Sequence, residues 1–138
     1  MQRFKGKVVL VTGAGSGIGR ASAIRLAAEG GAVFCVDLDG AAAESTVAEI
    51  AGEGGSASAW VCDVGNESSV CEAIEACIDT YGSLFGLVNM AGILRVDDTQ
   101  ELQTGHWQKV IDVNLTGTMF LCRAALPHLL ETKGSIVN

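Results

Sequence analysis

Residues 10–20 read LVTGAGSGIGR and place four glycines within seven positions, between an apolar run and a stretch with helical periodicity. Glycine destabilises the interior of regular structure by about 0.5–1 kcal/mol relative to alanine, so this cluster indicates that something approaches the backbone closely. The apolar run over 7–12 has the length and β-branched content of a strand that is covered on both faces. The segment therefore predicts a buried strand, a glycine-rich turn and a helix, in that order.

Strand-like and helix-like segments alternate along the rest of the chain. We expect further strands over 32–37, 56–63, 84–89 and 135–138, with helices over about 19–29, 41–51, 67–81 and 104–130. Pro127 should kink or end the last helix. The alternation predicts one α/β domain over 1–138, in which a doubly wound parallel sheet lies between two helix layers and binds its ligand beyond the carboxyl ends of the strands.

The glycine loop opens a helix, and a helix N-terminus carries unpaired N–H groups and a partial positive charge. A pyrophosphate is stabilised there when no side chain is in the way. The spacing Gly13-x-x-x-Gly17-x-Gly19 departs from the G-x-G-x-x-G fingerprint, and no Gly-Lys-Ser/Thr follows, which excludes a P-loop. On this motif alone, a tight turn that binds nothing is the alternative.

Asp37 ends the second expected strand, twenty residues after Gly17. A carboxylate at that place can hydrogen-bond the ribose diol of NAD and would repel the 2′-phosphate of NADP. Ser16 and Leu38 are neutral, so neither supplies the cation that a phosphate requires. These residues favour NAD, with an aspartate that only shapes a turn or caps a helix as the alternative.

Composition excludes several classes of partner. The net charge of −7 argues against nucleic acid and anionic membranes. The longest apolar run, 84–94, is too short to span a bilayer and no secretory signal is present, so we expect a cytoplasmic protein.

The cysteines show no C-x-x-C pair, so we expect no metal site. We expect five buried, reduced cysteines: Cys35, Cys62, Cys71, Cys77 and Cys122.

Four blocks occur in order along the chain: TGAGSGIG at 12–19, CDV at 62–64, NMAG at 89–92 and VNLTG at 113–117. Together they resemble the short-chain dehydrogenase/reductase family over essentially the whole chain. The resemblance implies a Rossmann-type fold, interrupted after the fifth strand, and an NAD-dependent oxidoreductase that transfers hydride between nicotinamide and a secondary alcohol or ketone. It also implies a homo-oligomer, a dimer or tetramer, paired in part through the helix at 104–130.

The resemblance also assigns the cofactor-binding residues. It places the pyrophosphate on the glycine loop, the adenosine ribose at Asp37, the adenine ring beside Asp63, and a second ribose near the NMAG block. The implied residues are Gly13, Gly15, Ser16, Gly17, Ile18, Gly19, Asp37, Leu38, Asp63, Val64, Asn89, Ala91 and Gly92.

Asn114 is the one catalytic candidate. It shares a helical stripe with Val110, Gly117 and Leu121, where we expect a buried amide, and a buried amide must find partners. The resemblance implies that this Asn holds a water in a proton relay. An Asn satisfied by local backbone is the alternative.

The family's Tyr, Lys and Ser follow the fifth strand, and nothing in this sequence matches them. Tyr81, the single tyrosine, has Phe85 where the lysine would stand and is expected to pack in the core. His106 and His128 have no nucleophile spaced for a relay. We therefore expect the amino-terminal part of a longer enzyme, inactive alone. A non-catalytic dinucleotide-binding or interaction module is the alternative. A methyltransferase, which also combines a glycine-rich first loop with an acidic residue at the end of the second strand, is a third possibility. Thr12 argues against it, because that class carries an acidic residue near the start of the loop.

Overall fold

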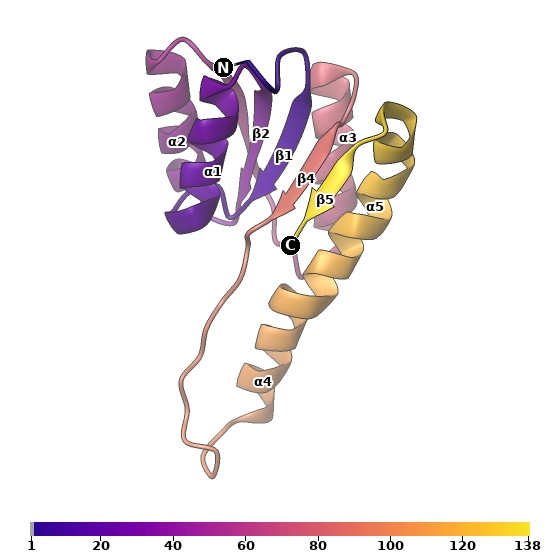
Figure 1. Ribbon diagram of the computed structural model, residues 1–138. Helices are drawn as coiled ribbons and strands as arrows, with labels where there is room; N and C mark the ends of the chain where they lie inside the picture. The colour runs from indigo at the N-terminus through magenta and orange to yellow at the C-terminus, as the bar shows by residue number, and fades with distance from the viewer. Residues whose placement is uncertain (1) are drawn as a thin grey trace.

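Five parallel strands form the centre of the molecule in the computed structural model, which describes residues 2–138 (Figure 1). Their order in the sheet is β3-β2-β1-β4-β5, so the chain starts at the centre and changes direction between β3 and β4. This arrangement confirms the predicted doubly wound sheet. The strands are β1 (Val8–Thr12), β2 (Ala32–Asp37), β3 (Ser56–Val61), β4 (Gly86–Asn89) and β5 (Ser135–Val137).

Helices cover both faces of the sheet (Figure 1). On one face lie α1 (Gly17–Ala28) and α2 (Gly40–Gly52), and on the other α3 (Glu67–Tyr81) and α5 (Gly117–Thr132). A short helix α4 (Thr104–Ile111) and one π-helical turn η1 (Asp112–Thr116) lead into α5.

Alternate side chains of each strand enter different cores because the side-chain period of a strand is two. Val9 and Val11 pack with Ala23 of α1 and Ile50 of α2. Leu10, between them in sequence, joins the core that α3 and α5 complete. β1 is therefore buried on both faces, as its continuous apolar sequence predicts.

The expected helix over 104–130 differs from the observed structure in two ways. The π turn η1 interrupts it, and α5 continues past Pro127 to Thr132, so Pro127 does not end the helix. Pro127 is exposed, so its ring lies on the solvent side of α5. The buried positions instead recur every four residues: Val113, Gly117, Leu121, Ala125 and Leu129.

The predicted burial of all five cysteines is wrong at two positions. The predicted packing role of Tyr81 is confirmed. Cys35, Cys62 and Cys77 are buried, whereas Cys71 is exposed and Cys122 is half-buried. Burial raises the pKa of Cys35 and Cys77 to about 12. The Tyr81 hydroxyl lies 2.9 Å from Ser58 Oγ, and its ring meets Phe34 edge-on.

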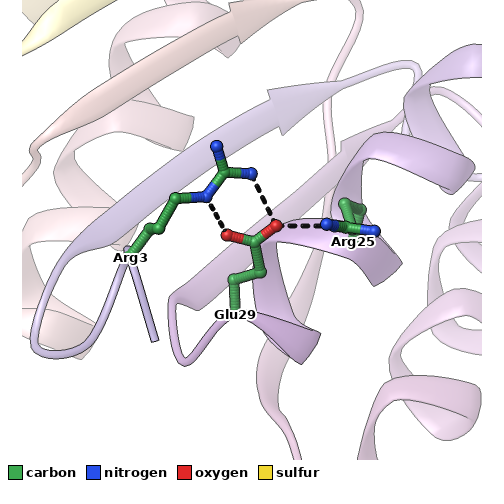
Figure 2. A network of polar contacts seen from close by, with 3 residues as sticks. All are labelled: Arg3, Arg25 and Glu29. Carbon is green, nitrogen blue, oxygen red and sulfur yellow. Dashed lines mark hydrogen bonds and ion pairs between the residues drawn. The ribbon is translucent and has the colours of Figure 1, made fainter. Parts of the chain in front are cut away.

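An ion cluster joins the segment before β1 to the end of α1, and Figure 2 shows Glu29 between two guanidinium groups. Arg3 Nη2 and Arg25 Nε each donate to Glu29 Oε1 over 2.6 Å, and Arg3 Nε donates to Oε2. These hydrogen bonds, first from Arg3 and then from Arg25, lower the pKa of Glu29 to about 2.

Within residues 2–138, no helix has both the length and the apolar character needed to cross a bilayer.

Candidate functional site

A cavity of about 610 Å³ opens at the carboxyl ends of the strands, where the glycine loop, the end of β2, the segment after β3 and the segment after β4 converge. This is the edge at which the doubly wound fold predicts a ligand. The predicted cofactor residues that line it are Gly13, Ser16, Gly17, Ile18, Gly19, Asp37, Leu38, Asp63, Val64, Ala91 and Gly92.

The glycine loop is held so tightly that two of its glycines cannot carry a side chain. Gly13 has φ +63°, and a Cβ there would lie 2.9 Å from Ala91 N. A Cβ on Gly19 would lie 2.1 Å from the Gly13 carbonyl oxygen. The glycines therefore let the first turn of α1 and the segment after β4 approach the end of β1 closely.

Helix α1 opens without the usual capping contacts. Its N-cap residue, Ser16, makes no side-chain hydrogen bond to the first turn, and that turn contains no acidic residue. Both Ser16 and Gly17 line the cavity. The first N–H groups of α1 and their partial positive charge are available to an anion in the cavity.

Thr12, at the end of β1, holds the cavity wall that is formed by the segment after β4. Its side chain is fully buried, and its hydroxyl accepts hydrogen bonds from the N–H groups of Met90 and Ala91, each over 3.1 Å. This pair of contacts ties the segment after β4 to the start of the glycine loop. Ala91 and Gly92 line the cavity as a result.

Asp37 is oriented by backbone donors on both sides. Its Oδ2 accepts from Gly15 N–H over 2.8 Å, and its Oδ1 accepts from Asp39 N–H over 3.0 Å. The helix-capping interpretation of Asp37 is wrong, because Asp39 is the N-cap of α2 and accepts from Ala42 N–H. Gly15 lies behind Asp37 and does not line the cavity.

Asp63 and Val64 form the wall beyond β3. Asp63 Oδ1 accepts from Gly65 N–H over 2.9 Å. Val64 is buried against the start of α5, where a Cβ on Gly117 would lie 2.7 Å from the Val64 carbonyl oxygen. Next to them, burial raises the pKa of the Cys62 thiol, which also lines the cavity.

Besides Gly15, two predicted residues, Asn89 and Asn114, do not line the cavity. Asn89 donates from Nδ2 to Asn138 Oδ1 over 2.7 Å and to Cys122 Sγ over 3.6 Å, while its Oδ1 is buried without a partner in residues 2–138. Asn114 is paired with Ile93, accepting from its N–H and donating to its carbonyl oxygen, both over 2.8 Å.

The expected burial of Asn114 is wrong, because its side chain is exposed. The π turn η1 contains an additional residue relative to an α-helical turn and so shifts the phase of the buried stripe. Val113 takes the buried position that helical periodicity gave to Asn114. The amide is satisfied by the backbone of Ile93, which is 21 residues away in sequence.

Several cavity residues were not predicted from sequence, among them Met90, Ile93, Lys109 and Val113. Met90 and Ile93 flank predicted positions and could have been found by their adjacency. Lys109 precedes Val113 by four residues, so spacing on the last helix was an available signal.

Within residues 2–138, no group of three or more His, Cys, Asp or Glu side chains is placed to hold a metal ion.

Comparisons with known proteins place this geometry in a family. A family model described as short chain dehydrogenase matches residues 7–138. The chain is 39% identical to D-threitol dehydrogenase of Mycolicibacterium smegmatis, over 99% of this chain and 53% of the relative. It is also 39% identical to cyclohexanol dehydrogenase of an Acinetobacter species, over 99% of this chain and 55% of the relative.

A solved structure supports the same assignment. The citronellol catabolism dehydrogenase of Pseudomonas aeruginosa superposes with a TM-score of 0.92 at 33% identity, over 99% of this chain and 56% of that one. The chain thus spans about half the length of the relatives it matches. The match of the family model to residues 7–138, the identity to these dehydrogenases and the shared fold show that the chain belongs to the short-chain dehydrogenase/reductase family.

Proposed function

We propose that these 138 residues form the NAD-binding part of an oxidoreductase that interconverts a secondary alcohol and a ketone. The observation that carries the proposal is the cavity at the carboxyl ends of the strands, which has the open N-terminus of α1 on one side and the Asp37 carboxylate on another. These two features are complementary to a diphosphate and to a sugar diol.

The diphosphate fits the first turn of α1. An anion there would meet N–H groups that no side chain caps, in a loop where a Cβ on Gly13 or Gly19 would collide with backbone. Because the helix dipole and the unpaired donors act on the same spot, the site favours two linked phosphates over a neutral ligand.

Asp37 supports NAD over NADP. Each of its oxygens accepts one N–H group, and each keeps lone-pair capacity for a ribose hydroxyl. Leu38 beside it is exposed and uncharged. Lys109, the one basic side chain that the described residues contribute to the cavity wall, lies beside Asp63 instead. A 2′-phosphate would thus meet a carboxylate with no adjacent cation.

The remaining walls suit the other ends of the cofactor. By resemblance to the family, Asp63 and Val64 would hold the adenine ring, and Ala91 and Gly92 would lie beside the second ribose. When bound, the nicotinamide ring supplies the hydride donor or acceptor. Asn114 fixes Ile93 next to these residues and keeps one amide hydrogen for a water, which supports its proposed place in a proton relay.

Turnover is proposed to need residues beyond these 138. The single tyrosine, Tyr81, has its hydroxyl beside Ser58 and its ring against Phe34, away from the cavity lining. We expect this polypeptide to bind dinucleotide without oxidising an alcohol. Measurable alcohol oxidation by the purified 138-residue chain would contradict that expectation. If it never acts within a longer enzyme, a dinucleotide-binding module is the alternative function, whereas the methyltransferase interpretation has no support from the family match.

The proposal is tested by titrating the chain with NADH and NADPH and measuring both dissociation constants by calorimetry. The wild type should bind NADH more tightly. Asp37→Ala should weaken NADH binding by about tenfold or more, because a charged hydrogen bond contributes roughly 1.5–3 kcal/mol, and should narrow the preference over NADPH.

Asp79→Ala is the matched control, since Asp79 is an exposed carboxylate on α3, outside the cavity lining. It should leave both constants unchanged. A wild type that binds neither dinucleotide, or an Asp37→Ala variant with an unchanged ratio, would overturn the proposal of an NAD site.

A further inference from the structure

Lys109 is the basic side chain of the candidate site to which neither the motifs nor the family resemblance gives a role. It lies on α4, and its Nζ is 3.5 Å from Asp63 Oδ2, across 46 positions of sequence. Both side chains are partly exposed at the mouth of the cavity, with relative accessibilities of 49% and 37%. The pair joins the wall formed by α4 to the wall that follows β3.

Three of the four polar atoms of Asp63 are hydrogen-bonded to the turn and helix that follow it. Its N–H donates to Ser69 Oγ over 3.2 Å, its carbonyl oxygen accepts from Asn66 N–H over 3.0 Å, and its Oδ1 accepts from Gly65 N–H over 2.9 Å. Within residues 2–138, the remaining atom, Oδ2, has Lys109 as its partner. The backbone thus holds one carboxylate oxygen and leaves the other to the lysine.

Lys109 is itself directed toward this place by the fold. Val113, four residues further along in η1, is buried and lines the same cavity, so both residues face it. A Cβ on Gly65 would lie 3.6 Å from the Asp112 carbonyl group, so the turn after Asp63 packs on the start of η1, directly after α4. The packing of the residues that follow Lys109 therefore holds its ammonium group close to Asp63.

We propose that Lys109 is a positioning residue that holds Asp63 Oδ2 in place to accept a hydrogen bond from the 6-amino group of the cofactor's adenine ring. The inference rests on the proposed function and extends it to the choice of base. A carboxylate fixed at both oxygens keeps one rotamer, so less ordering is needed when the ring arrives. Since carboxylate oxygens accept more than one hydrogen bond, the lysine and the amino group can share Oδ2.

The test compares NADH with reduced nicotinamide hypoxanthine dinucleotide, which carries a carbonyl oxygen in place of the 6-amino group. Lys109→Gln removes the charge and should weaken NADH binding by about threefold to tenfold, as for a partly exposed charged contact. Binding of the hypoxanthine analogue should change by less than about twofold, because the analogue has no amino group for Asp63 to bind. An equal loss for both ligands, or no loss for NADH, would refute the role of Lys109.

Three further variants separate positioning from folding and from general charge. Lys109→Arg keeps a cation and should restore the wild-type preference between the bases. Lys5→Gln makes the same charge change at an exposed site before β1 and should change neither dissociation constant. In an Asp63→Asn background, Lys109→Gln should add less than about a twofold effect on NADH, since the two residues act as one unit.

Failure of this inference can be told apart from failure of the proposed function. A wild-type chain that does not bind NADH removes the NAD site, and the inference falls with it. A wild type that binds NADH, beside a Lys109→Gln variant of equal affinity and base preference, removes the inference alone.

Discussion

At the scale of single residues, Thr12 links the two halves of the candidate site. One hydroxyl oxygen accepts the N–H groups of Met90 and Ala91, and a buried N–H without a partner is costly. The same residue ends the central strand and precedes the first glycine of the loop. Its side chain therefore sets how far the segment after β4 stands from the glycine loop.

Replacing Thr12 by valine should destabilise the fold by about 1–3 kcal/mol, because valine keeps the shape of threonine and removes the acceptor of two amides. Thr12→Ser is the matched control, which keeps the hydroxyl and should lose less. Urea unfolding followed by circular dichroism measures both free energies. Equal losses for the two variants would show that packing, and not the hydrogen bonds, makes Thr12 important.

At the scale of elements, the ion cluster of Arg3, Arg25 and Glu29 fastens the segment before β1 to the C-terminal end of α1 (Figure 2). The folded state holds the pKa of Glu29 at about 2, below its ordinary value of 4.5. A lowered carboxyl pKa contributes stability that is complete above about pH 4.5 and is lost as the pH falls toward 2.

Glu29→Gln should therefore lower the melting temperature near neutral pH, and its difference from wild type should disappear between pH 4.5 and 2. Glu53→Gln provides the control, because Glu53 occupies the equivalent C-cap position of α2 and is exposed. Its melting temperature should follow that of the wild type at every pH. A Glu29→Gln difference that is constant with pH would contradict the electrostatic explanation.

The elements that could be predicted from sequence are those with a periodic signal. The five strands and the helices α1 to α3 follow from apolar runs and helical spacing, and the structure shows Asn66 capping α3 by accepting from Ser69 N–H. The π turn η1 has no such signature, because its hydrogen-bond register changes without a change in residue type. The error in the burial of Asn114 follows from that one turn.

The site shows the same division. Gly13, Asp37 and Asp63 follow from motifs and from their places at strand ends, and the structure brings them to one cavity. The contact of Lys109 with Asp63 could not be predicted, because the two residues lie 46 positions apart and meet only through tertiary packing. Contacts between residues far apart in sequence are set by topology, which single residue types do not encode.

At the scale of the whole molecule, apolar side chains are exposed along the helix that leads from α4 into α5. Met119, Leu126 and Leu130 recur at helical spacing with 45%, 47% and 70% exposure, and Trp107 is 57% exposed. Large apolar side chains exposed together along one helix are typical of an association site. It gives the expected homo-oligomer a specific location on the molecule.

Size-exclusion chromatography with light scattering should therefore find the chain larger than its monomer mass of 14.2 kDa. The double variant Leu126→Glu with Leu130→Glu should shift it toward the monomer, because like charges would face each other across the contact. Ala48→Glu, on the exposed side of α2, is the control and should leave the mass unchanged. A wild type that is monomeric at every concentration tested would reject this location.

The ion cluster and the cavity lie at opposite ends of β1, since Arg3 precedes the strand and Gly13 follows it (Figure 1). Five strand residues separate them by about 15 Å. Attachment to a biosensor surface near Arg3 should thus leave the glycine loop facing the buffer. The geometry makes the amino-terminal end the practical handle for immobilising this protein while its nucleotide affinity is measured.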